Sequence, residues 1–245
     1  MSYCHQLRVL LGVAVLFSAG CGNLPGRPTP DSVVTDPDKI ANFQLLFNSN
    51  CSGCHGAEGK GGAALSIADP VYLAIADDTL IRKVVTNGIP GTSMPAFAKS
   101  AGGMLTANQV DIIVRGLREH YAKPDALAGS TPPSYVSAET GDVTRGAAVY
   151  TNFCASCHGP VGKGGSKASS IVDGTFLALL TDQELRTLVI VGRPDLGAPD
   201  WRSNVPGKPM SAQEISDVVA WLASQRPQFA GSPYPIAARS AGDHP

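Results

Sequence analysis

The sequence lacks a strong excess of either charge and is poor in aromatic side chains. Its 245 residues include 19 Lys and Arg against 20 Asp and Glu, and Phe, Trp and Tyr together make up 6% of the chain. The balanced charge provides no basic face for a nucleic acid, so no nucleic-acid partner is expected. So few aromatic rings leave little large apolar surface to fill cores built from side chains alone. We therefore expect something other than side chains to fill part of the interior.

The N-terminal segment contains an apolar run that is too short to span a bilayer. Residues 9–19, VLLGVAVLFSA, follow a start with one Arg and no acid, and they end before Gly20 and Cys21. The sequence SAGC resembles a bacterial lipobox, although Ser18 stands where Leu is usual. We predict a lipoprotein signal peptide over 1–20 and lipid attachment at Cys21, on the periplasmic side of a bacterial membrane. An uncleaved membrane anchor is the alternative.

Segments rich in proline and polar residues divide the rest of the chain. Such segments favour tethers and linkers because they bury little apolar surface. The predicted order is a flexible tether over 21–37, a first domain over 38–121, a linker over 122–140, a second domain over 141–226 and a disordered tail over 227–245.

No alternating strand pattern of any length is present, whereas apolar residues recur at helical spacing in both domains. The last helix of each domain begins with a capping box, Thr106 with Gln109 and Ser211 with Glu214. The predicted helices span 38–50, 78–88, 106–121, 142–153, 182–192 and 211–225. The predicted fold class is therefore all-α, with two small helical domains in tandem.

Two nearly identical stretches of twelve residues lie 103 positions apart, CSGCHGAEGKGG at 51–62 and CASCHGPVGKGG at 154–165. Both contain CxxCH, the attachment signature of haem c, in which two thiols reach the vinyl groups on one porphyrin edge and the adjacent His ligates iron. A zinc site would need the two cysteine pairs together, and a thioredoxin-like motif would need a βαβ context. The sequence therefore predicts two covalently bound haem c groups. Their attachment residues are Cys51, Cys54 and His55, and Cys154, Cys157 and His158.

The two domains resemble the class I cytochrome c family in its two-domain bacterial form. The resemblance covers about 40–121 and 142–226, and beyond CxxCH it rests on GIPGTSMPAF at 88–97, GRPDLGAPDW at 192–201 and SDVVAWL at 216–222. It implies that the first and last helices of each domain cross near the haem edge. It also implies that a methionine-bearing loop covers the distal side of the haem.

The predicted helix crossing can be examined within this one sequence. Gly146 on the first helix of the second domain corresponds to Phe43, and Trp221 on the last helix corresponds to Gly116. The second domain thus has the small residue on its first helix and the large residue on its last helix. The first domain has the reverse arrangement. If these positions face each other, each crossing keeps a similar packed volume.

The sixth iron ligands differ between the two domains. Met94 is the predicted ligand of the first haem, where a thioether would raise the reduction potential. Aligning the two loops places Ala198 opposite Met94, and alanine cannot bind iron. Met210, the only methionine after His158, is the predicted ligand of the second haem, although its position just before a helix cap also suits a hydrophobic staple. An open or water-ligated second iron is the competing prediction.

The predicted function is single-electron transfer, and no catalytic residue is predicted. The chain would serve a bacterial respiratory or photosynthetic chain, as a membrane-tethered carrier or as the cytochrome subunit of a quinol-oxidising or terminal oxidase complex. Its expected partners are redox proteins of that chain and the membrane, through the lipid anchor. The alternative is a haem enzyme, such as a peroxidase, or a gas-binding module, and each of these needs an open second haem.

Overall fold

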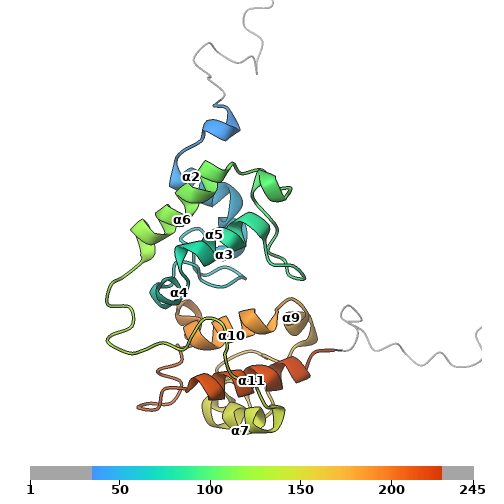
Figure 1. The fold of residues 1–245 in the computed structure, drawn as a ribbon. Helices are drawn as coiled ribbons and strands as arrows, with labels where there is room; N and C mark the ends of the chain where they lie inside the picture. The colour runs from blue at the N-terminus through green and yellow to red at the C-terminus, as the bar shows by residue number, and fades with distance from the viewer. Residues whose placement is uncertain (1–34, 228–245) are drawn as a thin grey trace, which may run out of the picture. The chain divides into compact units, whose positions relative to one another are not determined.

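The structure is a computed structural model that describes residues 35–227 (Figure 1). Ile40–Pro245 forms one compact unit, and the preceding unit, Met1–Lys39, contributes the 3-10 helix η1 (Pro37–Lys39). The predicted signal peptide, Cys21, most of the tether and most of the tail lie outside the described residues.

The described residues form helices joined by turns, with no β-strand among them and two isolated β-bridges. The predicted all-α class is therefore confirmed. The elements of the first domain are α2 (Phe43–Asn50), α3 (Ser52–His55), α4 (Pro70–Ile75), α5 (Asp78–Asn87), η2 (Lys99–Ala101) and α6 (Ala107–Tyr121). Those of the second domain are α7 (Val143–Phe153), α8 (Ala155–His158), α9 (Gly174–Ala178), α10 (Asp182–Val191), η3 (Pro194–Leu196) and α11 (Ala212–Ser224).

The long helices begin where side chains satisfy the first backbone N–H groups. Both predicted capping boxes, at Thr106 and at Ser211, are present, and Thr181 with Glu184 forms a third at the start of α10. The first predicted helix is shorter than expected. It begins at Phe43 because the side chain of Asn42 accepts a hydrogen bond from the Leu45 N–H (2.8 Å).

Two short helices, α4 and α9, were not predicted from the sequence. Each follows an aspartate, Asp69 or Asp173, whose carboxylate accepts two backbone N–H bonds from the first turn. Helices of five and six residues are too short to show apolar periodicity, so only the aspartate before Pro70 or Gly174 signals them.

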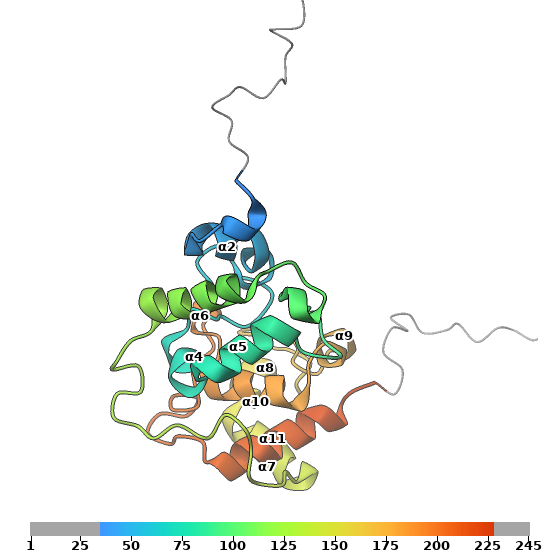
Figure 2. The ribbon, with the colours of Figure 1, turned by 45° about the horizontal axis from the view of Figure 1, so that its top comes forward.

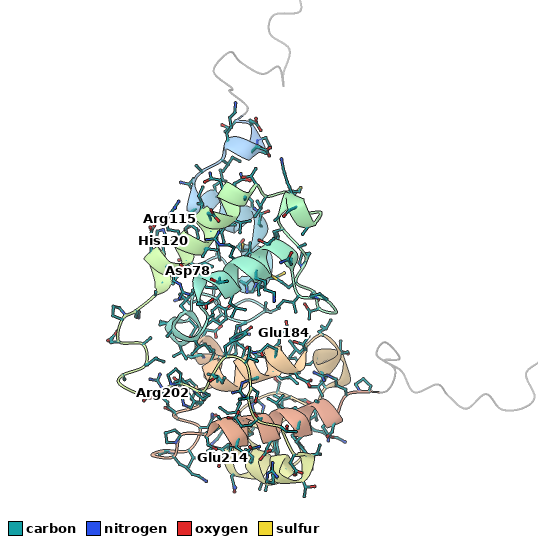
Figure 3. All side chains as sticks on the ribbon, viewed as in Figure 1. Asp78, Arg115, His120, Glu184, Arg202 and Glu214 are labelled. Atoms are coloured by element: carbon teal, nitrogen blue, oxygen red, sulfur yellow. The ribbon has the colours of Figure 1, made fainter. Side chains whose placement is uncertain are left out.

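The predicted helix crossing is confirmed in both domains. A Cβ atom added at Gly116 on α6 would overlap the ring of Phe43 on α2, and one added at Gly146 on α7 would overlap the α11 backbone and the Trp221 Cβ. Figure 2 shows α7 running beside α11. Figure 3 labels His120 near the end of α6. Its ring stacks on that of Phe43, with centroids 4.8 Å apart.

Candidate haem sites

Each CxxCH motif forms one helical turn directly after the first helix of its domain. The His55 N–H donates to the Cys51 carbonyl and the His158 N–H donates to the Cys154 carbonyl, both at 3.0 Å. Because residues four apart share a helix face, the first thiol and the imidazole of each motif lie on the same side of the turn. The structure thus brings each predicted set of attachment residues together.

A single hydrogen bond orients each imidazole. The Nδ1 atom of His55 lies 2.7 Å from the Leu65 carbonyl oxygen, and the Nδ1 atom of His158 lies 2.7 Å from the Ser169 carbonyl oxygen. This bond occupies Nδ1, so Nε2 is the nitrogen that remains for iron. Burial lowers the pKa of His55, the Leu65 bond acts in the opposite direction, and the charge of Arg193 lowers it further. The neutral imidazole that a metal requires is therefore favoured.

The four described cysteines form no disulfide, so their thiols are available for haem attachment. Burial raises the pKa of Cys51 to about 12 and that of Cys154 to about 11, and in each case the second cysteine of the motif adds to the shift. Burial, the larger cause of both shifts, keeps the first thiol of each pair away from water. Such surroundings fit a neutral thioether bond to the edge of a porphyrin.

Glycines allow the loop after each histidine to pack onto the attachment turn. Gly56 has a φ of +86°, and a Cβ atom at Gly62 would overlap the carbonyl oxygen of Cys54. In the second domain Gly159 has a φ of +78°, and a Cβ atom at Gly165 would lie 2.9 Å from the Cys157 carbonyl oxygen. A larger residue would force this backbone away from the haem attachment segment.

The same backbone hydrogen bond closes the distal loop of each domain. The Ile89 N–H donates to the Met94 carbonyl at 3.0 Å, and the Arg193 N–H donates to the Ala198 carbonyl at 2.9 Å. The structure therefore places Ala198 where the first domain has Met94, as the sequence alignment of the loops indicated. Met94 is half-buried, and its N–H donates to the Thr92 hydroxyl at 3.1 Å.

Met210 occupies the position that Leu105 takes in the first domain. The Met210 N–H donates to the Trp201 carbonyl at 2.9 Å, as the Leu105 N–H donates to the Phe97 carbonyl at 2.7 Å. The two side chains are 3% and 5% exposed, and each directly precedes a helix cap. This position is that of a hydrophobic staple. The amide nitrogen of Asn204 lies 3.8 Å from the Met210 sulfur, and the ligand role of Met210 stays a prediction.

The described residues fit a porphyrin better than a metal ion bound directly by side chains. No group of three His, Cys, Asp or Glu within 35–227 is placed to hold a metal ion. A porphyrin supplies four equatorial nitrogens, so the protein needs to add only axial ligands and thiols. No helix among the described residues is long and apolar enough to cross a membrane.

Two helical domains, each with a thiol pair and an oriented imidazole on one turn, define a tandem c-type cytochrome. The chain belongs to the family described as cytochrome c oxidase, cbb3-type, subunit III, whose model matches residues 38–115 and 141–222. It carries two covalently bound haem c groups and is an electron-transfer protein.

Curated relatives come from two kinds of respiratory complex. A CcoP subunit of a cbb3-type cytochrome c oxidase from Azospirillum is 32% identical over 59% of this chain and 48% of its own length. The cytochrome c subunit of a cytochrome bc1 complex from Mycobacterium bovis is 24% identical over 87% of this chain and 74% of its own length. A CcoP subunit from Rubrivivax gelatinosus is 29% identical over 55% of this chain and 38% of its own length. The chain thus matches about half or less of these two CcoP relatives.

Proposed function

We propose that the chain passes single electrons between a quinol-oxidising complex and a terminal oxidase, as a tethered carrier or as a cytochrome subunit. The observation that carries this proposal is the repeated haem turn, in which one chain holds two imidazoles anchored through Nδ1. The names of the relatives, an oxidase subunit and a bc1-complex subunit, support a place between these two complexes.

The protein holds its cofactors rigidly and excludes water from them. Haem supplies an iron that alternates between Fe(II) and Fe(III). His55 and His158 would be the proximal ligands, and Met94 would be the distal ligand of the first haem. Ligands that stay bound in both oxidation states keep reorganisation small, which favours rapid electron transfer.

The lipid anchor and the periplasmic location belong to this proposal. They rest on the apolar run before Cys21 and on SAGC, which lie outside the described residues. A bacterial lipoprotein carries more than one acyl chain, and two or more chains give stable anchoring. Such an anchor would keep the two haem domains near membrane complexes.

The test uses the full-length holoprotein in vesicles with a quinol-oxidising bc1 complex and a cbb3-type oxidase. The proposal predicts that quinol reduces both haems and that the oxidase reoxidises them, with oxygen uptake that depends on this protein. Haems that are reduced but never reoxidised by the oxidase would remove the proposed role while leaving the haem assignment intact.

A second candidate function, binding of a small ligand at the second haem, is favoured by one observation. Ala198 stands at the loop position of Met94, and Met210 stands at the position of the staple residue Leu105. If Met210 nevertheless ligates iron, Met210→Leu converts the second haem from low spin to a form that binds CO. If the wild-type second haem already binds CO and Met210→Leu changes nothing, the ligand-binding candidate replaces the Met210 prediction.

A further inference from the structure

An arginine in the distal loop of the second domain reaches the haem attachment loop of the first. Arg193 follows Gly192, the C-cap of α10, and its backbone closes the distal loop by donating to the Ala198 carbonyl. Its Nη2 atom donates to the Gly62 carbonyl at 2.8 Å. Both loops belong to the compact unit Ile40–Pro245. One residue thus has its backbone at one haem site and its charge at the other.

Asp195 completes this contact. Its carboxylate accepts from Arg193 Nε at 3.0 Å and Nη2 at 2.9 Å, and its Oδ2 also accepts from the Gly61 N–H at 2.8 Å. We call these four residues, Arg193, Asp195, Gly61 and Gly62, the loop clasp. The side chains of Arg193 and Asp195 are 15% and 9% exposed. Such a shielded bidentate pair is stronger than an exposed ion pair.

The clasp is attached directly to the first haem turn. Gly62 packs so closely on the Cys54 carbonyl that no Cβ atom fits there. Hydrogen bonding to Arg193, and then to Gly61, holds the pKa of Asp195 well below its usual range, so the pair stays ionised.

The first domain has no equivalent pair. Where the second domain has Arg193 and Asp195, the aligned positions of the first are Ile89 and Gly91, which carry no charge. The clasp is therefore a difference between the two copies and not a requirement of the distal loop itself. A charged pair that is present in only one domain is suited to giving the two haems different reduction potentials.

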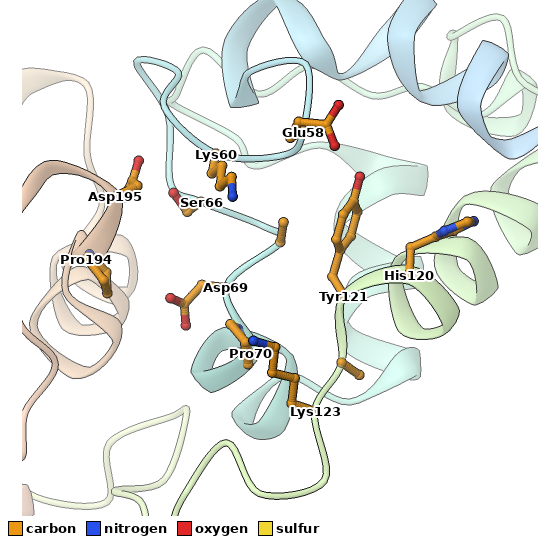
Figure 4. Close-up of a pocket in the computed structure, with 12 residues that line it drawn as sticks. Glu58, Lys60, Ser66, Asp69, Pro70, His120, Tyr121, Lys123, Pro194 and Asp195 are labelled. Atoms are coloured by element: carbon orange, nitrogen blue, oxygen red, sulfur yellow. The ribbon is translucent and has the colours of Figure 1, made fainter.

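The clasp borders an open pocket of about 390 Å³ (Figure 4). Glu58, Asp69, Lys60 and Lys123 line it together with Asp195, so it has no single sign of charge. Figure 4 shows Asp195 beside Lys60 and Ser66 at one end of the pocket. The mixed charges give no selective ligand site.

We propose that Arg193 is a positioning residue for electron transfer. Arg193 joins the distal loop of the second haem to the attachment loop of the first. Together with Asp195, it sets the reduction potential of the first haem relative to that of the second. This rests on the proposed electron-transfer role. An oxidised haem carries one more positive charge than a reduced one, so a nearby cation raises its potential and a nearby anion lowers it.

The test measures the midpoint potentials of both haems in the full-length holoprotein by spectroscopic redox titration. Arg193→Gln leaves the Asp195 carboxylate unbalanced, so the first-haem potential falls. Asp195→Asn leaves the Arg193 cation unbalanced, so the first-haem potential rises. The double variant Arg193→Gln with Asp195→Asn returns toward the wild-type potential.

Opposite shifts separate a charge effect from loosened packing, because a purely structural role would move both single variants in the same direction. Shifts of the same sign, or no shift in either variant, would overturn the proposal. Arg202→Gln is the matched control. Arg202 lies in the same loop and pairs with Asp200, and the hydrogen bonds described for this pair do not reach the first domain. Arg202→Gln is expected to shift the midpoint potential of the first haem less than Arg193→Gln does.

The joining role is tested by the rate at which an electron given to one haem equilibrates with the other. In a second double variant, Arg193→Ala with Asp195→Ala, the charges also balance but the side-chain bonds to Gly61 and Gly62 are lost, so equilibration is slower than in the wild type. Arg193→Lys, which keeps the charge but not the bidentate geometry, should retain the potential and also slow the exchange. Wild-type rates in both variants would contradict the joining role. These measurements need no oxidase. A failure of the proposed respiratory role would appear in the vesicle experiment and not in these potentials and rates.

Discussion

At the scale of single residues, the predicted ligation of the first haem depends on one side chain of its distal loop, Met94. Met94 and Ala198 lie at matching positions of two loops, where each carbonyl accepts the corresponding backbone hydrogen bond, so a methyl group in the second domain stands where the first has a thioether. This difference was visible in the sequence because glycines and prolines fix the alignment of the loops. The role of Met210 could not be predicted from the sequence in the same way. A methionine just before a helix cap can be either a staple residue or an iron ligand.

Met94→Leu tests the ligand assignment of the first haem. Leucine fills a similar volume but offers no lone pair, so we expect loss of the low-spin spectrum, a lower potential and new CO binding at the first haem. Met104→Leu is the control, because Met104 is 78% exposed and lies in the same domain. A low-spin first haem in the Met94 variant would show that another group is the ligand.

At the scale of elements, each domain is built on a helix crossing with a glycine at the contact, where Gly116 meets the Phe43 ring and Gly146 meets the α11 backbone and the Trp221 Cβ. The correspondence of Phe43 with Gly146 and of Gly116 with Trp221 was predictable because the sequence contains its own second copy. Helices α4 and α9 were missed because an aspartate cap is a common local signal that needs a longer apolar pattern to support it.

Gly116→Ala tests the crossing in the first domain. The added Cβ would overlap the Phe43 ring, so the free energy of unfolding should fall by about 1–3 kcal/mol. Arg115→Ala is the control, since Arg115 lies beside Gly116 on α6 and its side chain is 61% exposed. Combining Phe43→Gly with Gly116→Trp should destabilise less than the sum of the two single changes, as measured by chemical denaturation. Additive losses would show that the two positions do not face each other.

Asp217 on α11 links the second crossing to pH. Its side chain is 3% exposed and makes a bidentate ion pair with Arg145 on α7 at 2.8 Å, and this pair lowers the pKa of Asp217 to about 2. A depressed folded-state pKa contributes stability above the unfolded value of about 4. That contribution, at most about 2 kcal/mol, is lost as pH falls from about 4 through about 2.

Asp217→Asn should therefore destabilise the second domain at neutral pH and reduce the loss of stability between about pH 4 and pH 2. Thermal unfolding of the holoprotein, followed through the second haem over that pH range, measures both effects. If the Asp217→Asn variant keeps an acid profile as steep as that of the wild type, the acid sensitivity belongs to other carboxylates.

At the scale of the whole molecule, the repeat made the tandem all-α arrangement predictable, but the clasp was not. Arg193 and Gly62 are 131 residues apart, and an arginine that meets a glycine carbonyl leaves no periodic pattern in the sequence. The low aromatic content is explained by the two haems, which supply large apolar surfaces that side chains would otherwise provide. The predicted signal peptide and lipid site depend on the sequence alone.

The most direct test of the central claim is the number of covalent haems per chain. Mass spectrometry of the exported, acid-denatured protein should give the mature chain plus two haem masses, and replacing Cys51 and Cys54 with serine should leave one. A chain that carries fewer than two haems, or that releases them on acid extraction, would contradict the account.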